Sequence, residues 1–176
     1  MRIGLSDGEE KLEYTVSEPE YRELGSPLIG DELSDSEKIE LCDMRYRAKL
    51  YALRILSYGD NNEKNLKRKL ATKGISSEIA ADVCREMVGL GYVNEVRQLE
   101  KLIFAEANSR LSGRKRIFSK LLAKGYSKAD IARVLELLIS RGEVDFEASK
   151  KKLIEKKFPD GATDEEIFAL LYKHGF

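Results

Sequence analysis

The sequence has 176 residues, of which 42% are hydrophobic and 35% are charged, and a chain of this length can bury one sizeable core or several small ones. No stretch approaches the roughly 18 uninterrupted apolar residues of a membrane span, and MRIGLSDGEE lacks the pattern of a signal peptide. Two cysteines, Cys42 and Cys84, are too few for a disulfide framework. We therefore expect a cytoplasmic protein with no membrane association.

The charges are divided unevenly along the chain. Residues 1–43 carry 13 acidic and 4 basic side chains, a formal charge of −9, whereas residues 44–176 carry 18 acidic and 27 basic side chains, a charge of +9. A basic body favours an anionic partner, such as a nucleic acid or an acidic groove on a protein. From charge alone, an equally good interpretation is that lysines and arginines cover solvated helix faces.

The first 43 residues form a predicted acidic head. Its opening segments RIGL and KLEYTVS flank Asp7-Gly8, a pair suited to a tight turn, and together they predict a short β-hairpin. The stretch SEPEYRELGSPLIGDEL is rich in turn residues. Ser34 then suits the N-cap of a charged linker helix.

From residue 44 onward the pattern is helical. RYRAKLYALRILSYG predicts a helix that ends at Gly59, with one apolar stripe along it. The residues assigned to this stripe are Leu50, Ala52, Leu53, Ile55 and Leu56.

A repeat follows, with an offset of 51 residues. Leu66–Ser76 aligns with Ile117–Ser127, so that Gly74 falls on Gly125, and a third copy begins at Ile167. In each complete copy, the glycine predicts a left-handed end to the second helix, and the serine two residues later predicts the N-cap of the third.

The predicted fold is therefore all-α, with tandem three-helix repeats that pack on one another in an elongated curved array behind a small N-terminal β-hairpin head. The predicted domains are the head with its linker helix at 1–43, repeat 1 at 44–92, repeat 2 at 93–143 and a partial repeat 3 at 144–176.

The sequence offers no catalytic constellation. Its one histidine, His174, reads as a solvated side chain, and no Cys/His cluster has the spacing of a metal site. No glycine-rich loop follows a strand, so a phosphate or dinucleotide site is not predicted. Cys84 reads as a small core residue. We expect a protein that is not an enzyme and has no cofactor and no metal.

The basic clusters are the candidate functional residues, because regularly stacked repeats would align them along one surface. The predicted partner-binding or DNA-binding residues are Lys64, Lys67, Arg68 and Lys73 in repeat 1, Arg110, Arg114, Lys115, Arg116, Lys120 and Lys124 in repeat 2, and Lys151 and Lys152 in repeat 3. Three aromatic residues, Phe118, Tyr126 and Phe168, are expected in the core rather than on a base-stacking surface.

Four motifs, in this order and spacing, resemble the RecX family of recombinase regulators: Gly30-Asp-Glu-Leu-Ser34, Ala52-Leu-Arg-Ile-Leu-Ser57, Lys69-Leu-Ala-Thr-Lys-Gly-Ile75 and Gly91-Tyr-Val-Asn-Glu95. The resemblance implies a monomer that binds the RecA recombinase filament in its helical groove, and that dampens strand exchange and co-protease activity in DNA repair and the SOS response. It also implies contact with single- or double-stranded DNA. Two alternatives stay open: a helical-repeat DNA-binding protein that acts without a recombinase, and a plain interaction scaffold.

Overall fold

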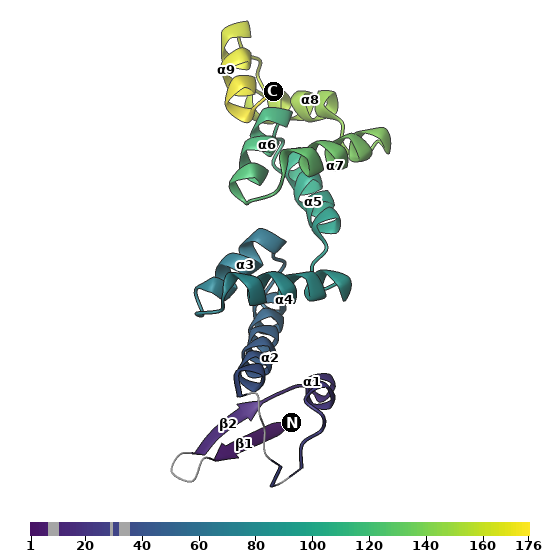
Figure 1. The fold of residues 1–176 in the computed structure, drawn as a ribbon. Coiled ribbons are helices and arrows are strands. Elements are labelled where there is room, and N and C mark those ends of the chain that lie inside the picture. Colours follow the sequence, from purple (N-terminus) through teal and green to yellow (C-terminus); the bar gives the residue numbers. More distant parts are fainter. Residues whose placement is uncertain (7–10, 29, 32–35) are drawn as a thin grey trace. The chain divides into compact units, whose positions relative to one another are not determined.

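The computed structural model describes residues 1–6, 11–28, 30–31 and 36–176. The described chain is mainly helical with one small antiparallel hairpin (Figure 1), which confirms the predicted helical class and the hairpin-bearing head. It divides into two compact bodies, an N-terminal body at Met1–Val93 and a C-terminal body at Asn94–Phe176. The predicted turn at Asp7-Gly8 and the predicted N-cap Ser34 lie outside the described residues.

The hairpin consists of β1 (Arg2–Ser6) and β2 (Lys11–Thr15), with Ile3 opposite Tyr14. A short helix follows, α1 (Glu18–Glu23), in the stretch that the sequence assigned to turns. That assignment was wrong, because Ser17 and Glu20 form a reciprocal capping box that begins the helix.

The long helix α2 (Ser36–Ser57) includes both the predicted linker helix and the predicted first helix of repeat 1. Its N-terminal half buries Ile39 and Cys42, and Cys42 joins Ile3 and Val16 of the head in one cluster. Its C-terminal half buries Ala48 and Ala52 in the core of repeat 1. At 100° per residue, Cys42 and Ala52 point about 80° apart, so different faces of α2 contribute to the head cluster and to the core of repeat 1.

The predicted apolar stripe on α2 is therefore only partly correct. Ala52 is fully buried, and Ile55 and Leu56 pack partly against the core, but Leu50 and Leu53 are exposed. These two leucines continue the face that the head covers farther up the helix, and not the face that repeat 1 covers.

Repeat 1 is completed by α3 (Glu63–Ala71) and α4 (Ser77–Gly89). The core contains Leu66 and Leu70 from α3 together with apolar residues of α4. Gly74 has a φ of +79° after α3, and the Ser76 hydroxyl accepts a hydrogen bond from the Ile79 amide at the start of α4. Both features agree with the prediction from the repeat.

The C-terminal body repeats this plan with α5 (Glu95–Phe104), α6 (Arg114–Ala123) and α7 (Lys128–Ser140). A π-helical turn, η1 (Ala105–Ser109), extends α5 and was not predicted. Two further helices follow, α8 (Phe146–Lys157) and α9 (Asp164–His174). The core of this body is built on Leu99, Ile103, Ile117 and Leu121, and on apolar residues of α7.

Candidate partner-binding surface

The basic residues of repeat 1 lie at and just beyond α3. Lys64 and Arg68 are one turn apart and exposed, and Lys73 is exposed after the helix ends. Among the described residues, no carboxylate forms an ion pair with any of these three. Lys67 is different, because its Nζ lies 2.5 Å from the Glu63 carboxylate on the preceding turn. Lys64, Arg68 and Lys73 therefore face water without a counter-ion among the residues that the structure describes.

Two predicted residues of repeat 2 are used inside the C-terminal body. Arg110 and Lys120 both pair with Glu106, a carboxylate that η1 holds in a buried position, and the Lys120 Nζ lies 2.5 Å from it. The Ser112 hydroxyl donates a third hydrogen bond over 3.0 Å. Burial alone would raise the pKa of Glu106, but the hydrogen bonds from Lys120, Arg110 and Ser112 outweigh it and lower the pKa.

The remaining predicted residues of repeat 2 are divided between internal contacts and solvent. Arg114 pairs with Glu136 of α7 at 2.7 Å, and Arg116 donates to the backbone carbonyl of Lys173 at 3.3 Å. Lys115 and Lys124 have exposed side chains at the two ends of α6. In repeat 3, Lys151 and Lys152 are exposed on α8.

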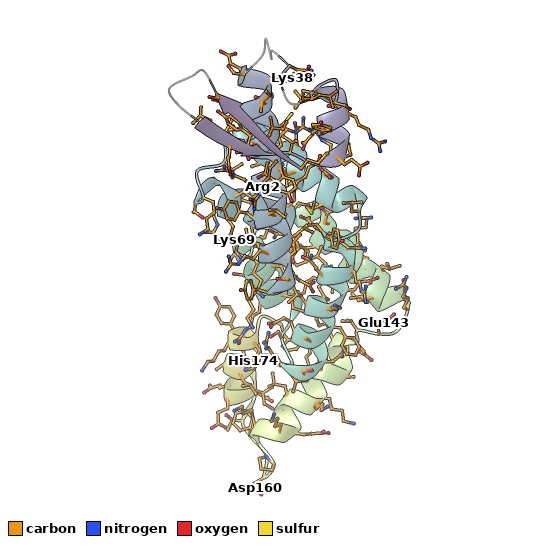
Figure 2. The ribbon with its side chains drawn as sticks, turned by 90° about the horizontal axis from the view of Figure 1, so that it is seen from below. Arg2, Lys38, Lys69, Glu143, Asp160 and His174 are labelled. Carbon is orange, nitrogen blue, oxygen red and sulfur yellow. The ribbon has the colours of Figure 1, made fainter. Side chains whose placement is uncertain are left out.

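Cys84 and His174, the two residues considered as possible reactive groups, are both at least partly buried. Burial raises the pKa of the Cys84 thiol to about 11, which keeps it protonated and unreactive at neutral pH. The Nδ1 atom of His174 lies 3.2 Å from the Leu111 carbonyl, and Figure 2 shows this residue where α9 meets the rest of the C-terminal body. His174 is thus half-buried and not the solvated side chain that was predicted.

Two kinds of feature are absent from the residues that the structure describes. No group of three or more His, Cys, Asp or Glu side chains there could hold a metal ion. None of the described helices combines the length and the hydrophobicity that crossing a membrane requires.

The three aromatic residues expected in the core differ in their burial. Tyr126 is buried and donates its hydroxyl hydrogen to Gln98 over 2.9 Å, and Phe118 packs partly against the core. Phe168 was predicted wrongly, because it is 72% exposed and stacks on the equally exposed Tyr172 one turn along α9, with ring centroids 6.4 Å apart. The sequence analysis also missed the burial of Glu106. A carboxylate is normally exposed, so its spacing of three and four residues from apolar positions did not by itself predict that it is buried.

Comparison with known proteins relates the chain to one family. Residues 48–87 match the family model described as "RecX, first three-helix domain". A "Regulatory protein RecX" from Caldanaerobacter subterraneus subsp. tengcongensis is 32% identical over 129 residues, which cover 73% of this chain and 64% of that relative. A second protein of that name, from Clostridioides difficile, is 31% identical over 104 residues, covering 58% and 49%. The chain thus spans about half to two thirds of the length of these two relatives.

Solved structures support the fold. A crystal structure of a regulatory protein RecX matches with a TM-score of 0.77 at 20% identity, over 98% of this chain and 87% of that chain. A crystal structure of RecX from Lactobacillus salivarius matches with a TM-score of 0.53 at 17% identity, over 74% and 96%.

Proposed function

The chain belongs to the RecX family, and from that premise we propose that it binds the helical filament of the RecA recombinase and lowers its activity. The action would be stoichiometric binding without turnover, by a monomer in the cytoplasm. By occupying the groove of the filament, the protein would slow filament growth, and so dampen strand exchange and co-protease activity in DNA repair and the SOS response.

The exposed cations of repeat 1 are the observation that supports this proposal most directly. Lys64, Arg68 and Lys73 have no ion-pair partner among the described residues, so their charge remains for an external anion. A filament on DNA offers such anions at a regular spacing, as phosphates or as acidic side chains. Lys115, Lys124, Lys151 and Lys152 have exposed side chains in the later repeats and extend the candidate surface.

Arg110 and Lys120 are weaker candidates for partner binding, because both already form ion pairs with the buried Glu106. Arg114 and Arg116 also make contacts inside the C-terminal body. Reversing the charge of Arg114, Lys115 and Arg116 would therefore disturb packing as well as any interface. A cleaner test changes only the exposed residues of repeat 1.

The test is a DNA-dependent ATPase and strand-exchange assay of the recombinase with and without this protein. We expect inhibition by the parent chain and its loss in the triple variant Lys64→Glu, Arg68→Glu, Lys73→Glu. A control with the same change in net charge is Arg54→Glu, Arg85→Glu, Arg133→Glu, whose residues are exposed on α2, α4 and α7. Equal inhibition by the parent and the triple variant would refute the role of the α3 cations.

The same cations favour one alternative, binding to DNA without a recombinase. Affinity for DNA measured against salt concentration separates the two possibilities, since each phosphate contact adds to the salt dependence. Tight, steeply salt-dependent binding by the protein alone, with no effect on the recombinase ATPase, would favour the alternative.

A further inference from the structure

One side of α2 continues beyond the hairpin as an exposed apolar face. The Thr15 amide of the hairpin donates to Asp43 on this side, and Figure 1 shows α2 running on from the hairpin to α3 and α4. Beyond Asp43, four large apolar side chains are exposed by 37% to 81%: Met44, Leu50, Tyr51 and Tyr58. We call these four residues, together with Arg47 and Arg54 between them, the α2 face.

The geometry of the helix brings these side chains together. At 100° and 1.5 Å per residue, all of them lie within about 60° of Arg47 and extend over about 21 Å. The buried Ala48 and Ala52 point about 100° to 140° away from Arg47, toward the core of repeat 1. Exposed apolar side chains are common when they are scattered, but several on one continuous face usually mark an interaction site. The α2 face is therefore separate from the core of repeat 1 and suited to a partner.

The charges along this part of α2 have one sign. Residues 44–59 include four basic side chains and no acidic one. Two of the four bases pair with carboxylates of the N-terminal body. Arg54 has no ion-pair partner among the described residues, and it lies about one turn from Tyr51 and from Tyr58. A partner with a carboxylate beside its apolar side chains would therefore complement the α2 face.

The composition of the α2 face favours a protein over a nucleic acid. Tyrosine, methionine and arginine are enriched in protein interfaces, where tyrosine and arginine often supply much of the binding energy. A nucleic acid would be held mainly through its phosphates, whereas Arg54 alone on this face offers a charge that is unpaired within the described chain. The aliphatic Met44 and Leu50, at the two edges of the face, match apolar side chains and not phosphates.

We propose that the α2 face binds a segment of the recombinase that presents apolar side chains with a carboxylate beside them. This inference rests on the proposed function, and it adds a contact with the recombinase protein to the cation contacts of α3. Tyr51 and Tyr58 would be buried against the apolar side chains of the segment and would supply most of the affinity. Arg54 would pair with the carboxylate, which favours an acidic segment over a basic one.

The first test is a titration of the recombinase ATPase. The double variant Tyr51→Ala, Tyr58→Ala should raise the half-inhibitory concentration about tenfold or more, because each change removes a large apolar contact. The matched control Tyr92→Ala, Tyr172→Ala removes two other tyrosines, which are 56% and 72% exposed, and should inhibit like the parent. Arg54→Glu alone should cost only about two- to threefold, because an ion pair that stays hydrated contributes little. Circular dichroism and thermal melting check that each variant is folded.

A photo-crosslink identifies the occupant of the α2 face. The photoreactive residue p-benzoylphenylalanine in place of Tyr58 should, on irradiation with recombinase filaments on single-stranded DNA, attach to a recombinase peptide. Mass spectrometry should find aspartate or glutamate beside apolar residues in that peptide. The same photoreactive residue in place of Tyr92 should give no recombinase adduct. Attachment of the Tyr58 probe to the DNA, to a second copy of the chain, or to a recombinase peptide without a carboxylate would overturn the proposal.

The ATPase assay separates this inference from the proposed function. If the parent chain leaves the recombinase ATPase unchanged, the proposed function fails and this inference fails with it. If the parent chain inhibits, and the folded variant Tyr51→Ala, Tyr58→Ala inhibits equally well, only the role of the α2 face is overturned. Equal losses in this variant and in the control Tyr92→Ala, Tyr172→Ala would overturn it too, because the loss would not be specific to α2.

Discussion

The amide of Gly113 donates a hydrogen bond to the carbonyl of His174 over 2.8 Å, and this contact joins the start of α6 to the end of α9. The Lys115 amide donates to the Gly175 carbonyl over 3.1 Å in the same junction. Gly113 has no side chain with which to cap α6, so the last carbonyls of α9 satisfy amides that would otherwise lack partners. Opposite ends of two helix dipoles also meet here, which is favourable.

Gly113→Ala should loosen this junction. A Cβ atom at residue 113 would overlap the backbone of Gly175, although the φ of −75° suits alanine. We expect a loss of about 1–3 kcal/mol in the free energy of unfolding, the usual cost of overpacking, measured by urea denaturation. Gly89→Ala is the matched control, since residue 89 is helical with no atom near its Cβ position, and alanine there should be neutral or stabilising. A fully stable Gly113→Ala protein would contradict the close approach.

Glu106→Gln tests the buried carboxylate. The variant keeps the shape of the side chain but loses two charge-assisted hydrogen bonds, from Arg110 and Lys120, so we expect about 1–3 kcal/mol of destabilisation. The control Glu136→Gln removes a carboxylate from an exposed pair and should cost less than about 1 kcal/mol. Equal effects of the two changes would argue against a special role for Glu106.

The stability of the parent chain should depend on pH through the same residue. Because the pKa of Glu106 is lowered in the folded state, its contribution is complete above the ordinary value of 4.5 and is lost as the pH falls through the folded-state pKa. The free energy of unfolding should therefore fall more steeply in acid for the parent than for Glu106→Gln. Parallel curves for the two proteins would refute this prediction.

His174 should make the stability of the chain depend on pH in a higher pH range than Glu106 does. Burial lowers the pKa of this imidazole and the hydrogen bond to Leu111 partly opposes the shift, while Arg116, Lys157 and Lys173 lower it further. The unfolded chain then binds a proton more readily than the folded one, so stability should decrease as the pH falls below 6.5. NMR titration of the only histidine measures the pKa directly, and His174→Gln should remove this part of the pH dependence. A measured pKa above 6.5 would contradict the prediction.

The buried thiol of Cys84 should resist alkylation in the folded protein. Its raised pKa and its full burial both reduce the amount of accessible thiolate. Iodoacetamide at pH 8 should modify Cys84 at a rate that rises sharply in denaturant, as followed by mass spectrometry. Rapid modification of the native chain would show that repeat 1 opens readily.

Local signals in the sequence predicted much of the fold correctly. Gly74 and Gly125 adopt positive φ, and Ser76 and Ser127 cap the next helices, because these roles depend on a single residue and its immediate neighbours. The same rule could have found α1, since Ser17 and Glu20 have the spacing of a capping box. The π-helical turn has no such local rule, and its buried Glu106 binds Lys120, which lies fourteen residues farther along the chain.

The candidate surface was harder to predict than the fold. Charge alone does not distinguish Lys64, which faces solvent, from Lys120, which binds a buried carboxylate fourteen residues away. Phe168 was misplaced for a related reason. Its repeat-equivalent Phe118 packs partly against the core of the C-terminal body, whereas Phe168 is exposed on α9, a helix with no fully buried residue.

The single helix α2 contributes buried residues both to the head cluster and to the core of repeat 1, so the stability of these two parts is coupled. The backbone amide of Thr15 in the hairpin donates a hydrogen bond to the Asp43 carboxylate of α2 over 2.8 Å. A cut in α2 near Asp43 would therefore release neither part intact. Mechanical or thermal unfolding of α2 should therefore unfold the hairpin and the core of repeat 1 in one cooperative transition.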